Sequence, residues 1–242
     1  MPTVFILIIA ALLCIAAIIL ALLVHRGLIN GYHPLPHPKP GQKRIACVGD
    51  SVTYGMWVAG QPRHSYPRRL GKLLGNEYCV GNFGYSDRCA SYKADKPYSA
   101  EKLFRQSLDF APDVVFLMLG SNDTKVINWD GQACFEGLCA LIDSYRALPS
   151  SPEVILLTPP PMFPVRGRIM WSLRDGVMEK EILPLYRDIA RSKGVRLVNT
   201  HDLLSNRKYF FADGVHPNAL GAEVIASAAY EALAGARIEE NK

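Results

Sequence analysis

The sequence predicts an α/β protein with a central parallel sheet covered by helices on both faces, preceded by one N-terminal transmembrane helix. From residue 43 onward, short apolar runs alternate with helical patterns, which is typical of βαβ units. These runs are almost entirely apolar, as expected for strands that are buried on both faces. The third observation is an unbroken apolar stretch over residues 4–24.

The apolar stretch has the length that a membrane-spanning helix requires, which is about 20 residues. A cleavable signal peptide is the competing interpretation, but its apolar region usually has about 7–15 residues and follows a basic start. Here nothing basic precedes the stretch except the amino terminus, and the sequence Val-His-Arg at residues 24–26 is a poor cleavage site. We therefore expect residues 1–25 to form an uncleaved anchor.

Residues 26–42 are rich in proline and predict an extended spacer between the anchor and the following domain. His33 and His37 have a spacing that could bind a metal ion from one helix. The intervening prolines exclude that helix, so we predict no metal site there.

Composition excludes some classes of function. The 242 residues carry a net charge of only +5, and the basic residues are scattered, so we expect no nucleic-acid partner. No cysteine forms a Cys-x-x-Cys pair, and no Cys/His spacing resembles a zinc site. Cys14 and Cys47 lie in apolar runs, so we expect them to be inert packing residues. Cys79 with Cys89, or Cys134 with Cys139, could form a disulfide if the domain lies outside the cytosol.

Residues 43–242 predict one domain without internal repeats. The expected strands are residues 44–48, 77–80, 114–119, 154–158 and 196–198. The expected helices are residues 66–74, 100–109, 132–147 and 175–192, followed by a closing helix over about 219–233.

Ser51 follows the first expected strand in the sequence Gly-Asp-Ser. Open α/β sheets place their reactive groups at the carboxyl ends of their strands, so Ser51 is a candidate nucleophile. A serine in such a turn more often only caps a helix. Near the end of the chain, Asp213 and His216 provide a carboxylate and an imidazole three residues apart, and this favours the catalytic interpretation. His216 can accept the proton of Ser51, and Asp213 can orient the imidazole.

Two other strand ends carry residues suited to stabilising an oxyanion. Gly84 would allow a backbone amide to approach a reacting centre closely. Asn122 could direct its side-chain amide into the same site. Taken alone, Gly84 is equally compatible with an ordinary turn, and an isolated asparagine such as Asn122 is more often a turn residue. The amide after the nucleophile is a further candidate donor.

Taken together, Gly49-Asp50-Ser51, Gly84, Gly120-x-Asn122-Asp123 and Asp213-x-x-His216 resemble the four blocks of the GDSL/SGNH hydrolase family. The resemblance covers residues 43–235 and implies a flavodoxin-like three-layer α/β/α fold. It implies a catalytic triad of Ser51, His216 and Asp213, and an oxyanion hole formed by the amides of Ser51 and Gly84 and the side chain of Asn122. No metal or organic cofactor is implied.

One position departs from the family pattern. Many members have a second glycine three residues after the glycine of the second block, where this chain has Asp87. An acidic side chain at the rim of the pocket could alter the choice of substrate. The Gly-x-Ser-x-Gly motif of α/β-hydrolases is absent, which disfavours that class.

The long segment over residues 158–171 predicts a lid or a substrate wall, or else a proline-rich structural crossover. With Trp57 and Trp129, its Arg166 and Arg168 would offer aromatic and cationic surface to a sugar ring or an anionic glycan. The segment looks like the carbohydrate O-acetylesterase branch of the family, so we expect removal of a small acyl group from a glycan. The alternatives are a lysophospholipase or thioesterase, and a catalytically silent, membrane-tethered glycan-binding protein.

Two arguments about the orientation in the membrane conflict. Basic residues follow the apolar stretch and none precedes it, which favours a cytosolic domain by the positive-inside tendency. Hydrolases with a single N-terminal anchor commonly display the enzyme outside, and we expect an extracytoplasmic catalytic domain.

Overall fold

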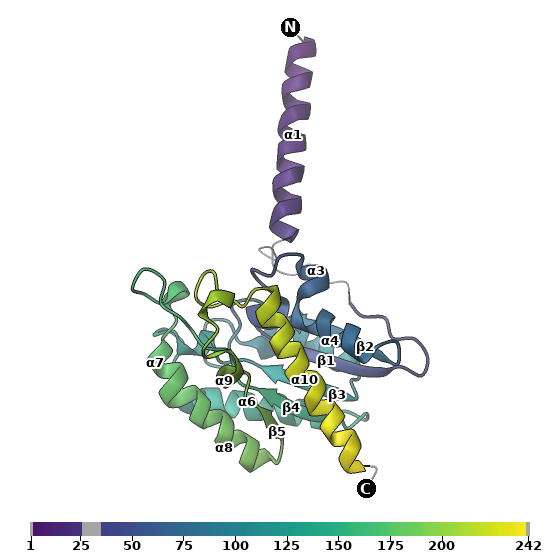
Figure 1. The fold of residues 1–242 in the computed structure, drawn as a ribbon, viewed down its shortest axis with the longest axis vertical. Helices are drawn as coiled ribbons and strands as arrows, with labels where there is room; N and C mark the ends of the chain where they lie inside the picture. The colour runs from purple at the N-terminus through teal and green to yellow at the C-terminus, as the bar shows by residue number, and fades with distance from the viewer. Residues whose placement is uncertain (1, 26–34, 241–242) are drawn as a thin grey trace.

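A computed structural model describes residues 2–25 and 35–240 (Figure 1). Most of the predicted spacer, including His33, lies outside the described residues. His37 lies in irregular chain that leads into a turn at residues 40–41.

The predicted N-terminal helix is present as α1, Pro2–His25. Its stretch Phe5–Leu22 has a mean hydropathy of 3.3 and is long and apolar enough to cross a membrane. A signal sequence has the same two properties, so length and composition alone do not separate the two interpretations.

The predicted parallel sheet is confirmed. The described chain has five parallel strands in the order β2-β1-β3-β4-β5, which is a flavodoxin-like order. Its strands are β1 Lys43–Gly49, β2 Tyr78–Gly84, β3 Val114–Met118, β4 Glu153–Leu157 and β5 Arg196–Val198. After β2 the chain crosses to the other side of β1, so the switch point of the topology lies between β1 and β3.

Both faces of the sheet are covered by helices, as predicted (Figure 1). Alternate residues of β1 point to opposite faces: Ala46 and Val48 pack in one cluster, and Ile45 and Cys47 in the other. The first cluster is covered by α5 Lys102–Asp109, α6 Gly131–Arg146 and α8 Leu183–Lys193. The second is covered by α4 Tyr66–Leu74, α9 Thr200–Leu204 and α10 Ala219–Glu240.

Several element boundaries differ from the prediction. The helix expected over residues 175–192 is divided into α7 Asp175–Val177, a π-helical turn Met178–Ile182 and α8. The short helices α2 Ser51–Tyr54, α3 Gln61–His64 and α9 were not predicted, because four or five residues carry too little periodicity.

The second strand is longer than predicted. The strand expected over residues 77–80 continues to Gly84 in the structure. Glycine and asparagine have low strand propensity, yet pairing with β1 through Gly49↔Gly84 overrides that preference.

Candidate active site

Ser51 lies at the junction between β1 and α2, which places it at the carboxyl edge of the sheet. The Asp50 side chain caps α2 by accepting a hydrogen bond of 3.0 Å from the Val52 amide. Gly49 has no room for a side chain, since a Cβ would lie 2.3 Å from the Met118 carbonyl oxygen of β3. The backbone around Ser51 is therefore tightly held, and Ser51 itself is only 7% exposed.

The two ends of the domain meet at this junction. His216 Nε2 lies 2.9 Å from Ser51 Oγ, and His216 Nδ1 lies 2.6 Å from Asp213 Oδ2. The other carboxylate oxygen of Asp213 accepts hydrogen bonds from the amides of Val215 and His216, at 3.0 and 2.8 Å. The three side chains thus form the continuous hydroxyl–imidazole–carboxylate chain that nucleophilic catalysis requires.

The charge of Asp213 is well stabilised. Burial by itself would raise the pKa of this carboxyl group, but the hydrogen bonds and positive charge of His216 and the two amides lower the pKa to about 2. Asp213 therefore stays ionised at any pH at which the protein would work, and it can stabilise an imidazolium ion at His216.

Asp50, directly before the serine, is in the opposite situation. Burial raises the pKa of its carboxyl group to about 6, although the Val52 amide and His216 oppose the shift. A buried carboxylate at neutral pH costs free energy of folding. The turn that presents Ser51 is thus held at some expense of stability.

Asn122 lies across the switch point, after β3, and is 6% exposed. Its side-chain amide donates to the carbonyl oxygen of Arg88 at 3.2 Å and more weakly to Asp50 Oδ2 at 3.5 Å. The neighbouring Asp123 holds the loop that follows β2, because its carboxylate accepts hydrogen bonds from the amides of Ala90 and Ser91, at 2.9 and 2.8 Å. Asn122 therefore lines the same pocket as Ser51. One of the two N–H groups of its side-chain amide makes only the long contact with Asp50.

The structure does not support Gly84 as an oxyanion donor. Its amide donates to Asn82 Oδ1 at 3.0 Å, and it does not line the pocket beside Ser51. The lack of a side chain serves packing, because a Cβ at Gly84 would lie 2.1 Å from the Tyr54 nitrogen. Three residues later, Asp87 lines the pocket with a left-handed backbone, φ 66°. Its amide has no acceptor within the described chain.

A pocket of about 250 Å³ opens beside Ser51 and His216. Its polar side is formed by Ser86, Asp87, Ser121, Asn122 and Lys125, and its apolar side by Val52, Met56, Trp171, Leu173 and Val215. Asp87 forms ion pairs with both Lys125 and Lys96. Burial raises the pKa of Asp87, but these two lysines outweigh it and lower the pKa below its usual value.

Of the residues predicted to contact substrate, only Asp87 lines this pocket. Trp57 and Trp129 are half-buried elsewhere, and Arg166 and Arg168 are exposed on the crossover after β4. Trp171 is not among the residues predicted to contact substrate, but it lies in the same crossover and donates from Nε1 to Asp213 Oδ2 at 3.1 Å. The only feature of the sequence that pointed to Trp171 was the aromatic character of the segment over residues 158–171.

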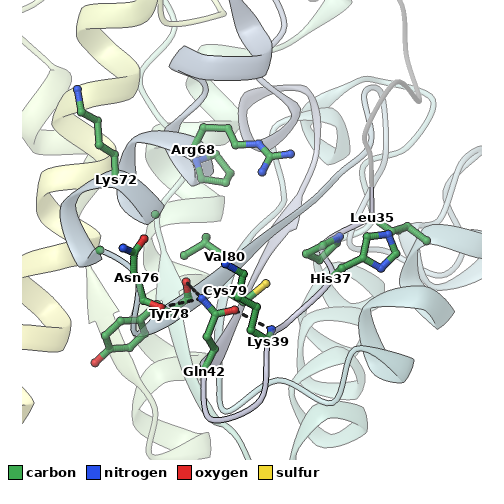
Figure 2. A pocket seen from close by; sticks show the side chains of 14 residues that line it. Leu35, His37, Lys39, Gln42, Arg68, Lys72, Asn76, Tyr78, Cys79 and Val80 are labelled. Atoms are coloured by element: carbon green, nitrogen blue, oxygen red, sulfur yellow. Dashed lines mark hydrogen bonds between the residues drawn. The ribbon is translucent and has the colours of Figure 1, made fainter.

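A larger hollow of about 610 Å³ lies away from the triad, between α4 and the outer strand β2 (Figure 2). It is lined by Lys39, Arg68 and Lys72, among other residues, and none of the predicted site residues lies there. All six cysteines are free, so neither of the two possible disulfides is formed.

Comparison with known proteins shows the family to which the chain belongs. The GDSL-like Lipase/Acylhydrolase family matches residues 47–224. An acetylxylan esterase of Xylanibacter ruminicola is 34% identical over 222 residues, covering 82% of this chain and 45% of that protein. A multidomain esterase of Ruminococcus flavefaciens is 32% identical over 219 residues, covering 76% of this chain and 27% of the relative. The chain thus spans less than half the length of these two relatives.

Solved structures have the same fold. A carbohydrate acetylesterase from Sinorhizobium meliloti superposes with a TM-score of 0.65 at 23% identity, covering 80% of this chain and 99% of that one. An aryl esterase from M. smegmatis gives the same TM-score and the same two coverages at 22% identity. The family match spans most of the domain and all four sequence blocks, so the chain belongs to the GDSL-like Lipase/Acylhydrolase family.

Proposed function

We propose that this protein is a serine esterase that removes small acyl groups, acetyl above all, from a carbohydrate. The observation that carries the proposal is the chain of contacts from Ser51 Oγ through His216 to Asp213, with distances of 2.9 and 2.6 Å. Residues 43–242 would form the catalytic domain.

The reaction has two steps. Ser51 Oγ attacks the ester carbonyl carbon while His216 Nε2 accepts the serine proton, and an oxyanion forms. When the tetrahedral intermediate collapses, the C–O bond to the alcohol breaks, and His216 gives its proton to the departing oxygen. His216 then accepts a proton from water as the water oxygen attacks the acyl carbon. When this second intermediate collapses, the bond from the acyl carbon to Ser51 Oγ breaks, His216 returns the proton to Oγ, and the acid leaves. Asp213 stabilises the imidazolium ion in both steps.

The oxyanion would be held by the Ser51 amide, the Asn122 side chain and, in place of Gly84, the Asp87 amide. The amides of Ser51 and Asp87 have no acceptor within the described chain. Asn122 can exchange its 3.5 Å contact with Asp50 for a shorter bond to the oxyanion. Donors already in position cost no reorganisation during the reaction.

The pocket supports a short acyl group. Its volume of about 250 Å³ is below the range of pockets that enclose drug-sized ligands, about 300–1,000 Å³. The acetylxylan esterase relative aligns with 82% of this chain. The lipid alternative would need a long apolar channel, whereas this pocket is small and has the charged side chains of Asp87 and Lys125 in its lining. The intact triad geometry disfavours the silent glycan-binding alternative.

We further propose that α1 anchors the protein in a membrane with the catalytic domain on the extracytoplasmic side, where acetylated glycans would be accessible. The support is the length and apolar character of α1.

The direct test is ester hydrolysis by the full chain in detergent, compared with Ser51→Ala. We expect the wild type to cleave p-nitrophenyl acetate and acetylated xylo-oligosaccharides and the variant to cleave neither. Along a series of acetate, octanoate and palmitate esters, kcat/KM should fall with chain length. A preference for palmitate would exclude deacetylation and favour the lipid alternative.

A further inference from the structure

Trp171 occupies an unusual place in the pocket. It lies in a 3-10 turn, Met170–Ser172, within the crossover between β4 and α7. The residue is 51% exposed and lines the pocket beside His216. Its φ is 63° and that of Ser172 is 58°, a left-handed conformation that bulky residues rarely adopt. Such a conformation persists only where surrounding contacts impose it.

Hydrogen bonds on both sides of Leu173 in the sequence hold this part of the crossover. On one side the indole Nε1 donates to Asp213 Oδ2 at 3.1 Å, and the ring meets His216 edge-on, with centroids 6.2 Å apart. On the other side the Arg174 amide donates to Thr124 Oγ1 at 3.1 Å. Leu173, between them, is buried. The indole is therefore fixed in orientation, although half of it is exposed.

The chemistry of the reaction identifies what this ring would contact. His216 Nε2 must give its proton to the oxygen of the departing alcohol, so the alcohol has to lie beside the imidazole. In the proposed reaction the carbonyl oxygen of the ester would be bound by Asn122, away from the departing alcohol. Trp171 flanks the imidazole, so it faces the alcohol part of the ester and not the acyl part.

We propose that Trp171 determines specificity by binding the sugar ring that carries the acetyl group, with the indole N–H holding the ring in position and the indole face contacting the sugar. This inference rests on the proposed function, because the alcohol of a glycan ester is the sugar itself. A rigid aromatic ring provides a large contact area and loses little conformational entropy when ligand binds.

The test compares two acetyl esters that differ only in the alcohol. Ethyl acetate has an alcohol too small to reach across the pocket, whereas an acetylated xylo-oligosaccharide presents a sugar ring. Both are assayed by acetate release with the full chain and with Trp171→Ala, Trp171→Phe and Tyr209→Ala. Tyr209 is a suitable control because it is an aromatic residue that is 74% exposed and does not line the pocket.

We expect Trp171→Ala to lower the ratio of kcat/KM for the glycan ester to kcat/KM for ethyl acetate about ten-fold or more, mainly through the KM of the glycan ester. The lost hydrogen bond to Asp213 acts on the triad and therefore affects both esters alike, so it cancels in this ratio. Trp171→Phe keeps an aromatic ring but not the N–H and should retain part of the preference, and Tyr209→Ala should retain all of it. The ratio of the kcat/KM values for the two substrates does not depend on the amount of folded enzyme.

Two results separate the possible failures. If Trp171→Ala lowers both values by the same factor, or lowers neither, Trp171 does not bind the sugar and the inference is wrong. If the wild-type chain releases acetate from ethyl acetate but not from the glycan ester, the proposed carbohydrate substrate is wrong.

Discussion

The junction after β1 and the crossover after β4 both reach the active site, but they are held in different ways. At the junction, residues 49–55 are buried and their backbone is fixed by strand pairing, by the Asp50 cap and by the close contact of Gly49 with β3. In the crossover, Arg166, Trp171 and Ser172 have left-handed backbones on exposed chain. The part around Trp171 is held mainly by bonds that involve side chains, from the indole to Asp213 and from Arg174 to Thr124. Ser51 is thus positioned by the backbone, whereas Trp171 is positioned by side-chain contacts with Asp213 and His216.

This difference implies that changes at the junction reduce turnover or folding, whereas changes in the crossover redirect the choice of substrate. The variants below test that division, in order of decreasing expected effect.

The largest effect is expected from Ser51→Ala and His216→Ala. Each should lower kcat for p-nitrophenyl acetate by at least about 10⁴-fold, because removing either member breaks the whole nucleophilic unit. Initial rates with purified full-length variants measure this. Arg168→Ala, on the exposed crossover, is the matched control and should retain full kcat. A comparable loss in the control would contradict the division between the two regions.

Asn122→Ala should lower kcat by about 10²–10³-fold and leave a measurable remnant, which is the usual effect of removing one oxyanion donor. Steady-state kinetics at saturating substrate measure it. Asn122 also accepts at its backbone carbonyl from Asn128 Nδ2 at 3.2 Å, a contact that the substitution leaves intact. A loss as large as that of Ser51→Ala would mean that Asn122 has a structural role instead.

A pair of glycines tests the same contrast by stability. Gly84→Ala would place a Cβ 2.1 Å from the Tyr54 nitrogen, so we expect the free energy of unfolding to fall by more than about 3 kcal/mol. Gly167→Ala, in the crossover, meets no atom within 4 Å and has only a φ of +79° to oppose it; we expect a loss of about 1 kcal/mol. Urea unfolding measures both, and equal losses would contradict the contrast.

Asp50→Asn should show that the junction is held at a cost that depends on pH. The pKa of Asp50 is raised from 3.8 to about 6 by burial, so the folded wild type binds the proton more tightly than the unfolded chain. Its stability is therefore greatest below pH 3.8 and is lost as the pH rises through about 6. The uncharged variant does not titrate, so its stability relative to wild type should increase over that interval by on the order of 2 kcal/mol.

Urea unfolding of both proteins at pH 4, 5 and 7 checks this linkage. A difference between wild type and Asp50→Asn that stays constant over this range would mean that Asp50 titrates normally in the folded protein.

How much the sequence predicts differs in the same way between the two regions. The alternation of apolar runs and helices predicted the sheet, and the segments at Ser51, Asn122 and residues 213–216 predicted where a site would form. Each of these residues follows a strand or precedes a helix, and a parallel sheet brings its carboxyl strand ends together at one edge. Local pattern therefore sufficed for these parts of the molecule.

The remaining features depend on contacts between segments that are distant in sequence. β2 extends to Gly84 because it pairs with β1, and within that strand the Asn82 side chain accepts from the Gly84 amide that the family resemblance implies for the oxyanion hole. Trp57, Trp129, Arg166 and Arg168 have suitable chemistry but do not line the pocket, whereas Trp171 reaches it by bonding to Asp213, 42 residues away. The sequence alone determined the sheet and the position of Ser51 at the end of its first strand, since strand periodicity is local. Only the tertiary structure decided which loop side chains face the substrate, because irregular backbone takes its direction from non-local contacts.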